Sequence, residues 1–167
     1  MIAYDILAES TGADLLVAAL LRRHETIACA ESLTAGLASA ALAGIPGVSD
    51  ALRGGVVVYS TDAKRILADV SQEALDAEGA VSAATAELMA ERIRLKLDAT
   101  WGLSLTGVAG PDPQEGVLPG TVYVGISGAG VSRSTKLALQ GDRWNVRLMA
   151  VARAFGEVLI ELSEERV

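Results

Sequence analysis

The sequence predicts an α/β fold, in which helices cover both faces of a mixed, mostly parallel sheet to give three layers (α/β/α). Two patterns lead to this prediction. Helical periodicity alternates with short apolar, β-branched runs early in the chain, whereas the last third holds two strands joined by the hairpin-like residues 127–130. With 167 residues, 51% of them hydrophobic, the chain has the size and apolar content of one domain over residues 1–167.

The first half is predicted to alternate helices with two strands. Leu15, Leu16, Ala19 and Leu20 recur at helical spacing, and Gly44 belongs to a cluster of turn residues. In chain order we expect a helix over about 9–23, a strand over 26–30, a helix of small residues from Gly36 to the turn at 44–47, and a strand over 52–59.

The second half is predicted to pass from helices to strands. Leu88, Met89 and Ile93 form an apolar helical stripe, and Asp142 is a plausible N-cap for a long last helix. In chain order we expect a helix starting at 60–64, a short acidic helix over about 71–78, a connector at 79–82, a helix over 84–97, strands over 100–108, 120–127 and 131–139, and a C-terminal helix opened by 141–143.

The composition excludes several classes of function. Fourteen Lys and Arg against 21 Asp and Glu give a formal charge of −7, so we expect no nucleic-acid and no membrane partner. An anionic small ligand would need a local positive pocket. The single cysteine, Cys29, and the single histidine, His24, exclude an internal disulfide and a His- or Cys-rich metal site. We therefore expect no bound metal.

The N-terminus and the apolar stretches carry no targeting signal. No basic segment precedes an apolar run at the N-terminus, and no stretch approaches the roughly 20 apolar residues that span a bilayer. We expect a cytoplasmic protein.

Polar residues and glycines gather at the predicted ends of strands, where α/β sheets bind their ligands. The first cluster, Glu31–Gly36, lies between a strand and a helix. Ser32 and Thr34 are there among unpaired backbone N–H groups, which favour a phosphate or the oxyanion formed when a serine attacks a carbonyl. A cap on the following helix is the alternative role for both hydroxyls.

Lys64 ends a second cluster, Tyr59–Lys64, after the second predicted strand. It is one of three lysines, with Lys96 and Lys136. A desolvated lysine has a lowered pKa and can act as a general base toward a serine. The alternative is a solvated surface lysine.

Two further clusters supply backbone and guanidinium donors. Residues 106–112 (TGVAGPD) combine a hydroxyl with glycines that allow close backbone approach, although no Gly-Lys-Ser/Thr follows as in a P-loop. Arg143, at the start of the last helix, is placed to grip a phosphate or carboxylate, and Arg147 lies one turn further on. The alternative for residues 106–112 is a plain turn. The alternative for Arg143 is an exposed arginine paired with a nearby acid such as Asp142.

Taken in order, six stretches resemble the C-terminal domain of the CinA (competence/damage-inducible) family, which includes a nicotinamide-nucleotide amidase. They are 30–36 (AESLTAG), Tyr59-Ser60 with Lys64, 79–82 (GAVS), 106–112, 119–123 (PGTVY) and 141–143 (GDR). The resemblance covers about residues 10–160. It implies a three-layer, CinA-like (anticodon-binding-domain-like) fold, no cofactor, and hydrolysis of nicotinamide mononucleotide to nicotinate mononucleotide and ammonia.

The resemblance also implies roles for individual residues. It places Ser32 and Lys64 in the active site, with Tyr59, Thr106 and Arg143 close by. Neutral Lys64 would take the proton of Ser32, which attacks the carboxamide or orients a water, and Tyr59 or Thr106 would relay a proton to the departing ammonia. The residues expected to bind substrate or its oxyanion are Glu31, Leu33, Thr34, Gly107, Ala109, Gly110 and Arg143.

The sequence departs from the family pattern at two places. Ala35 replaces a common glycine, which matters if that position needs a positive φ. The loop 112–117 lacks a glycine pair often found after the aspartate, and Pro113 suggests a stiffer lip. Neither change removes a proposed catalytic group.

Two other functions fit the same residues. One is a non-catalytic nucleotide-binding or competence/damage-related interaction module, which the departure from the family pattern at Ala35 favours. The other is a hydrolase with the same machinery that acts on another pyridine nucleotide or a different amide. The resemblance also leads us to expect a homo-oligomer.

Overall fold

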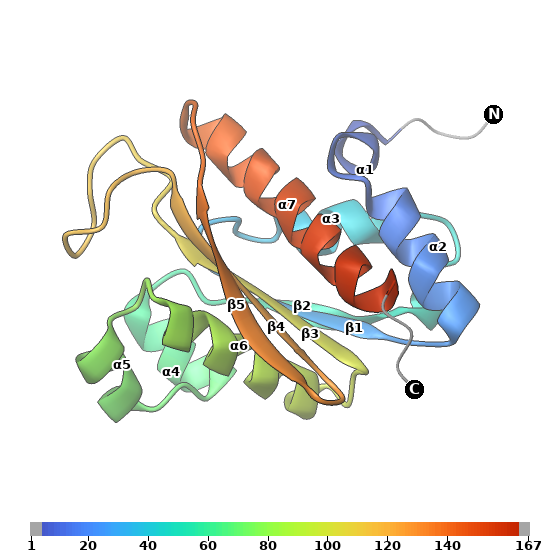
Figure 1. Cartoon of the computed structure of the whole chain (residues 1–167), viewed down its shortest axis with the longest axis horizontal. Coiled ribbons are helices and arrows are strands. Elements are labelled where there is room, and N and C mark those ends of the chain that lie inside the picture. Colours follow the sequence, from blue (N-terminus) through green and yellow to red (C-terminus); the bar gives the residue numbers. More distant parts are fainter. Residues whose placement is uncertain (1–4, 164–167) are drawn as a thin grey trace.

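A five-stranded mixed sheet forms the centre of the molecule (Figure 1). The structure, a computed structural model, describes residues 5–163. The strands are β1 (Ile27–Glu31), β2 (Leu52–Val57), β3 (Trp101–Gly107), β4 (Thr121–Gly128) and β5 (Val131–Ala138), in the spatial order β2-β1-β3-β4-β5. β1 pairs in parallel with β2 and β3, whereas β4 runs antiparallel to β3 and β5. Four strands therefore share one direction, and the predicted hairpin is confirmed.

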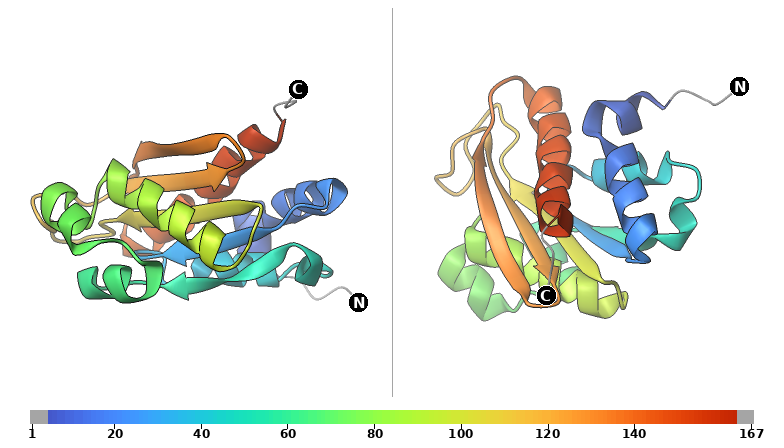
Figure 2. Two further views of the ribbon diagram at one scale, coloured as in Figure 1. Left: turned by 90° about the horizontal axis from the view of Figure 1, so that it is seen from below. Right: turned by 45° about the vertical axis from the view of Figure 1, so that its right-hand side comes forward.

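Helices cover both faces of the sheet, which confirms the three predicted layers (Figure 2). One face carries α1 (Ile6–Thr11), α2 (Ala13–Arg23), α3 (Leu37–Ala43) and α7 (Arg143–Ser163); the other carries α4 (Thr61–Ala68), α5 (Gln72–Glu78) and α6 (Ala83–Lys96). A short 3-10 turn, η1 (Val48–Asp50), precedes β2. The fold is the one that the resemblance implied.

Side-chain alternation divides the core between the two faces. In β1, Ile27 and Cys29 pack among the residues under α2 and α7, whereas Ala28 and Ala30 pack under α6. Burial raises the pKa of the Cys29 thiol well above its ordinary value, and the charge of Glu31 adds to that effect. This cysteine is a core residue.

The sheet surface under α6 lacks side chains at two positions. A Cβ atom at Gly102 or Gly125 would collide with the carbonyl oxygens of Ala90 and Ala86, respectively. The absence of these two side chains lets α6 lie directly on β3 and β4. The connector 79–82 before α6 is thereby fixed relative to the strand ends.

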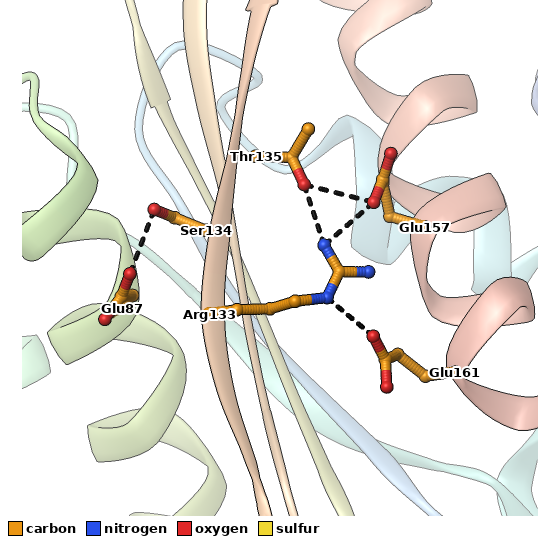
Figure 3. A network of polar contacts seen from close by, with 6 residues as sticks. All are labelled: Glu87, Arg133, Ser134, Thr135, Glu157 and Glu161. Carbon is orange, nitrogen blue, oxygen red and sulfur yellow. Dashed lines mark hydrogen bonds and ion pairs between the residues drawn. The ribbon is translucent and has the colours of Figure 1, made fainter. Parts of the chain in front are cut away.

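The outer strand β5 is held to α7 by an ion-pair network (Figure 3). The Arg133 guanidinium contacts Glu161 at 2.6 Å and Glu157 at 2.9 Å, and also donates to the Thr135 hydroxyl. Partial burial by itself would lower the pKa of Arg133, but the hydrogen bonds and charges of the two glutamates outweigh it and raise that pKa. The network stabilises an exposed sheet edge.

The predicted elements differ from the observed ones at two places. The helix expected over 9–23 is two helices, because Gly12 adopts φ = 69° and both ends α1 and begins α2. The strand expected over 52–59 ends at Val57, and Tyr59 thus belongs to the loop before α4. The remaining boundaries agree within three residues.

Candidate active site

A pocket of about 240 Å³ opens where β1, β2 and β3 end, opposite the start of α7. It is lined by Ser32, Leu33, Tyr59, Gly107, Val108, Ala109, Gly110, Asp112, Pro113, Gln114 and Arg143. Seven of these residues were among those expected from the sequence. The pocket therefore joins the four clusters that lie far apart along the chain.

Ser32 and Lys64 meet at the inner wall of the pocket. The Ser32 backbone N–H donates to the Leu105 carbonyl at 2.8 Å, which fixes the residue between β1 and β3. Lys64 projects from the first turns of α4, which is capped by the Ser60 hydroxyl. Its Nζ lies 3.0 Å from Ser32 Oγ and 3.2 Å from the carbonyl oxygen of Val58.

The surroundings of Lys64 favour its neutral form. The side chain is 2% exposed, and no carboxylate of residues 5–163 lies within 4.0 Å of its ammonium group. Burial lowers the pKa of Lys64 from 10.5 to about 8, and the more distant charge of Glu115 opposes that effect. About a tenth of the Lys64 side chains are consequently neutral and able to accept a proton at pH 7, and about half at pH 8.

Glu31 organises the turn that follows Ser32. Its carboxylate accepts hydrogen bonds from the N–H groups of Gly36, Ala38 and Ser39 and from the Ser39 hydroxyl. The side chain is fully buried and is not among the pocket-lining residues. The structure thus places Glu31 as a cap of α3, behind the pocket wall, and not in the substrate-contacting position given to it from the sequence.

The turn contains the departure at Ala35. This residue adopts φ = 51° and Gly36 adopts φ = 95°, so two successive residues are left-handed. Alanine in this region clashes with its own backbone, whereas glycine does not. The chain therefore carries local strain next to Ser32.

Arg147 holds the same turn from the opposite side. Its guanidinium, reaching from α7, donates to the carbonyl oxygens of Leu33 and Thr34 at 2.9 Å each. In a planar trans peptide the N–H points away from the C=O, so the Thr34 N–H is directed away from Arg147. The N–H groups of Leu33 and Thr34 have no hydrogen-bond partner among residues 5–163. Leu33 lines the pocket next to Ser32, so its N–H is available to an oxyanion near Ser32 Oγ.

Thr34 also has an unpartnered hydroxyl. Its side chain is completely buried, and within the described part of the chain Oγ1 makes no hydrogen bond. Thr34 is not among the residues that line the pocket, so this hydroxyl lies behind the pocket wall.

Arg143 joins two walls of the pocket. It donates to the Gly110 carbonyl at 2.7 Å and to the Tyr59 hydroxyl. Asp142 does not pair with it but caps α7 through the Asn145 N–H. The N–H groups of Ala109 and Gly110 have no partner within residues 5–163. This side of the pocket therefore presents a cation and free N–H donors, as an anion requires.

Thr106 lies behind the pocket. Its buried hydroxyl donates to the Ala80 carbonyl at 2.7 Å, and the residue is not among those that line the pocket. The structure therefore gives Thr106 the task of holding the connector 79–82 to β3. Its neighbour Gly107 does line the pocket, and a Cβ atom there would collide with Thr121 and Val122 of β4.

The sequence reasoning missed four lining residues, Val108, Asp112, Pro113 and Gln114. Val108 and Asp112 lie in the glycine-containing stretch 106–112, so their position after β3 was the available signal. Pro113 and Gln114 belong to the loop 112–117, which was noted because it lacks a glycine pair after the aspartate. Their approach to Ser32 depends on the path of this loop, which no local pattern specifies.

The described residues contain neither a cluster of metal ligands nor a membrane-spanning helix. Among residues 5–163, no three His, Cys, Asp or Glu side chains gather in a way that would hold a metal ion. None of the helices in this range combines the length and apolar content needed to cross a bilayer.

Comparison with known proteins identifies relatives along nearly the whole chain. The model of the CinA C-terminal domain matches residues 9–162. A CinA-like protein of Frankia casuarinae is 45% identical over 135 residues, which is 81% of this chain and 31% of that protein. A Streptococcus pneumoniae protein described as competence-damage inducible is 43% identical over 151 residues, 90% of this chain and 36% of that protein. The chain spans about a third of the length of these curated relatives.

Solved structures of similar proteins have the same fold. The competence damage-inducible protein A of Klebsiella pneumoniae superposes with a TM-score of 0.89 at 29% identity, covering 97% of this chain and all of that one (100%). A competence/damage inducible protein of Agrobacterium tumefaciens gives a TM-score of 0.86 at 29% identity, covering 96% of this chain and 98% of that one.

Proposed function

Because this chain belongs to the CinA C-terminal domain family, we propose that it is a nicotinamide-nucleotide amidase, which converts nicotinamide mononucleotide and water into nicotinate mononucleotide and ammonia. The observation that carries the proposal is the buried contact of 3.0 Å between Lys64 Nζ and Ser32 Oγ. A serine beside an underpaired lysine, at the wall of a pocket, is the arrangement of an activated nucleophile.

In the first half of the reaction Ser32 displaces ammonia. Neutral Lys64 takes the hydroxyl proton as Ser32 Oγ bonds to the carboxamide carbon, and the carbonyl oxygen becomes an oxyanion held by the free N–H groups at Leu33 and Thr34. Collapse of this intermediate breaks the C–N bond. The Lys64 ammonium returns its proton to the leaving nitrogen, directly or by way of the Tyr59 hydroxyl.

In the second half water releases the product. Neutral Lys64 now takes a proton from water, which adds to the ester carbon, and Ser32 Oγ leaves with that proton. The products are the carboxylic acid and the restored serine. No metal ion is needed for either half.

The outer part of the pocket suits the phosphate of the substrate. Arg143 and the N–H groups of Ala109 and Gly110 supply the positive site that an acidic chain needs for an anionic ligand. A pyridine mononucleotide satisfies both ends of the pocket, since it carries a carboxamide at one end and a phosphate at the other.

Ammonia release from nicotinamide mononucleotide tests the proposal. We expect turnover by the wild-type chain in the presence of a metal chelator, and a loss of about 10³-fold or more in Ser32→Ala. The dinucleotide and free nicotinamide, assayed beside the mononucleotide, identify the preferred amide. Nucleotide binding by calorimetry without ammonia release from a folded wild-type protein would contradict the proposal and support the interaction module.

A further inference from the structure

The loop between β3 and β4 ends in a tight turn whose tip is Glu115. Gln114 and Val117 form an antiparallel bridge with both backbone hydrogen bonds made, at 3.1 and 2.8 Å. The two central residues are left-handed, with φ = 50° at Glu115 and φ = 75° at Gly116. Such a turn favours Asn, Asp or Gly at its first central position. A glutamate there is unexpected on local grounds.

The Glu115 side chain leaves its own loop and reaches another segment. Its carboxylate accepts a hydrogen bond from the Ala80 N–H at 3.1 Å. The Ala80 carbonyl in turn accepts from Thr106, and the Gly79 carbonyl accepts from Thr85 at 2.6 Å. The anchor point is therefore fixed to β3 and to α6. Glu115 thus fastens the loop that supplies Pro113 and Gln114 to the pocket.

The same carboxylate is the acid whose charge acts on Lys64. Other charged groups near this lysine are engaged elsewhere. The Glu31 carboxylate is bonded to the backbone of α3, and Asp62, on the same helix as Lys64, pairs with Arg65. Arg143, which follows β5, bonds to Gly110 and Tyr59. Within residues 5–163, no Lys, Arg or His lies within 4.0 Å of Glu115.

We propose that Glu115 is a positioning residue for the Ser32–Lys64 pair: its carboxylate fastens the pocket loop to Ala80, and its negative charge acts on Lys64 through space. The inference rests on the proposed function. When Lys64 takes the Ser32 proton it becomes an ammonium ion, and the Glu115 charge stabilises that ion through space. The role corresponds to that of the acid in a serine–histidine–acid triad, without direct contact between acid and base.

Glu115→Gln separates the charge from the hydrogen bond, because the amide oxygen still accepts from Ala80. Without the charge, the pKa of Lys64 should fall below its value of about 8, by about 0.5–1. The acidic limb of the pH–rate profile should move to lower pH by the same amount. On the alkaline plateau kcat should drop about three- to tenfold with KM nearly unchanged, since the ammonium ion is less stabilised. Glu115→Ala should also raise KM, because the loop is unfastened.

Lysine NMR measures the coupling without any assay of turnover. The chain has three lysines, so ¹³C-lysine labelling gives three side-chain signals, and the signal missing from Lys64→Met identifies Lys64. Its pH titration is compared in wild type, Glu115→Gln and the control Glu91→Gln, which removes an exposed charge of α6 next to Arg92. Lys96 and Lys136 serve as internal references.

A Lys64 titration that is identical in wild type and Glu115→Gln overturns the proposal. A lower pKa of Lys64 in Glu115→Gln, with no change in Glu91→Gln, supports the proposal. This holds even if the wild-type protein releases no ammonia. In that last case the proposed amidase function fails while the coupling between Glu115 and Lys64 stands, so the two failures are distinguishable.

Discussion

Two basic side chains of this molecule, Arg133 and Lys64, have opposite surroundings. Arg133 lies at the outer sheet edge against two carboxylates and a hydroxyl, and these partners raise its pKa (Figure 3). Lys64, on α4, lies beside the ends of β1 and β2 with one hydroxyl and one carbonyl as partners, and burial lowers its pKa to about 8. A cation paired with two carboxylates, as Arg133 is, is a structural element. A buried cation with too few acceptors is poised to release its proton.

Lys64→Arg removes this difference and should have the largest effect. Arginine stays protonated at every accessible pH, so the residue at position 64 is no longer able to take the Ser32 proton. We expect kcat for ammonia release to fall about 10²–10⁴-fold. The matched control is Arg133→Lys, which keeps a cation between Glu157 and Glu161 and should leave turnover within about twofold of wild type. Nearly wild-type turnover in Lys64→Arg would remove Lys64 from the chemistry.

The lowered pKa of Lys64 should also make the free energy of unfolding depend on pH, and this effect is smaller than that of Lys64→Arg on turnover. The pKa of Lys64 is lower in the folded chain, about 8, than in the unfolded chain, 10.5. Between these two values the unfolded chain binds more protons, so the free energy of unfolding rises with pH. We expect the wild type to gain about 2 kcal/mol relative to Lys64→Met between pH 7 and pH 9.5. Urea unfolding of both proteins measures the gain, and parallel pH curves would contradict it.

Ala35→Gly should have the smallest effect. Ala35 is exposed and left-handed, so glycine removes a steric cost that is partly offset by the greater entropy of the unfolded chain. We expect the free energy of unfolding to rise by about 0.5–1 kcal/mol. Ala40→Gly, at an exposed position inside α3, should lower it by about 0.5–1 kcal/mol. If urea unfolding shows that Ala35→Gly lowers the free energy of unfolding as Ala40→Gly does, Ala35 is not strained.

Much of the pocket could be predicted from the sequence because it follows a rule of α/β sheets. Polar and glycine-rich stretches after parallel strands meet at one sheet edge, which brought Ser32, Tyr59 and Gly107 together. The start of α7 contributes Arg143, as the family resemblance had implied. Position along the chain was sufficient for these residues, since each lies within two residues of the end of a strand or the start of a helix.

The direction of side chains was harder to predict. Glu31 lies on the same side of β1 as Ile27 and Cys29, and that side faces α3. Alternation groups these residues, but it does not tell which helix will cover them. The contact of Arg147 with Leu33 spans 114 residues and that of Glu115 with Ala80 spans 35. Such contacts depend on how helices and loops pack, and no local period encodes them.

The start of α7 has a consequence for the kinetics of ligand capture. Its first turn holds no acidic residue, and the charges of Arg143 and Arg147 outnumber that of the capping Asp142 at the positive end of the helix dipole. The chain as a whole carries −7. An approaching anion is therefore repelled at long range and attracted only within about 10 Å of the pocket. Added salt screens the distant repulsion more than the close attraction, so an anionic ligand should associate faster as ionic strength rises.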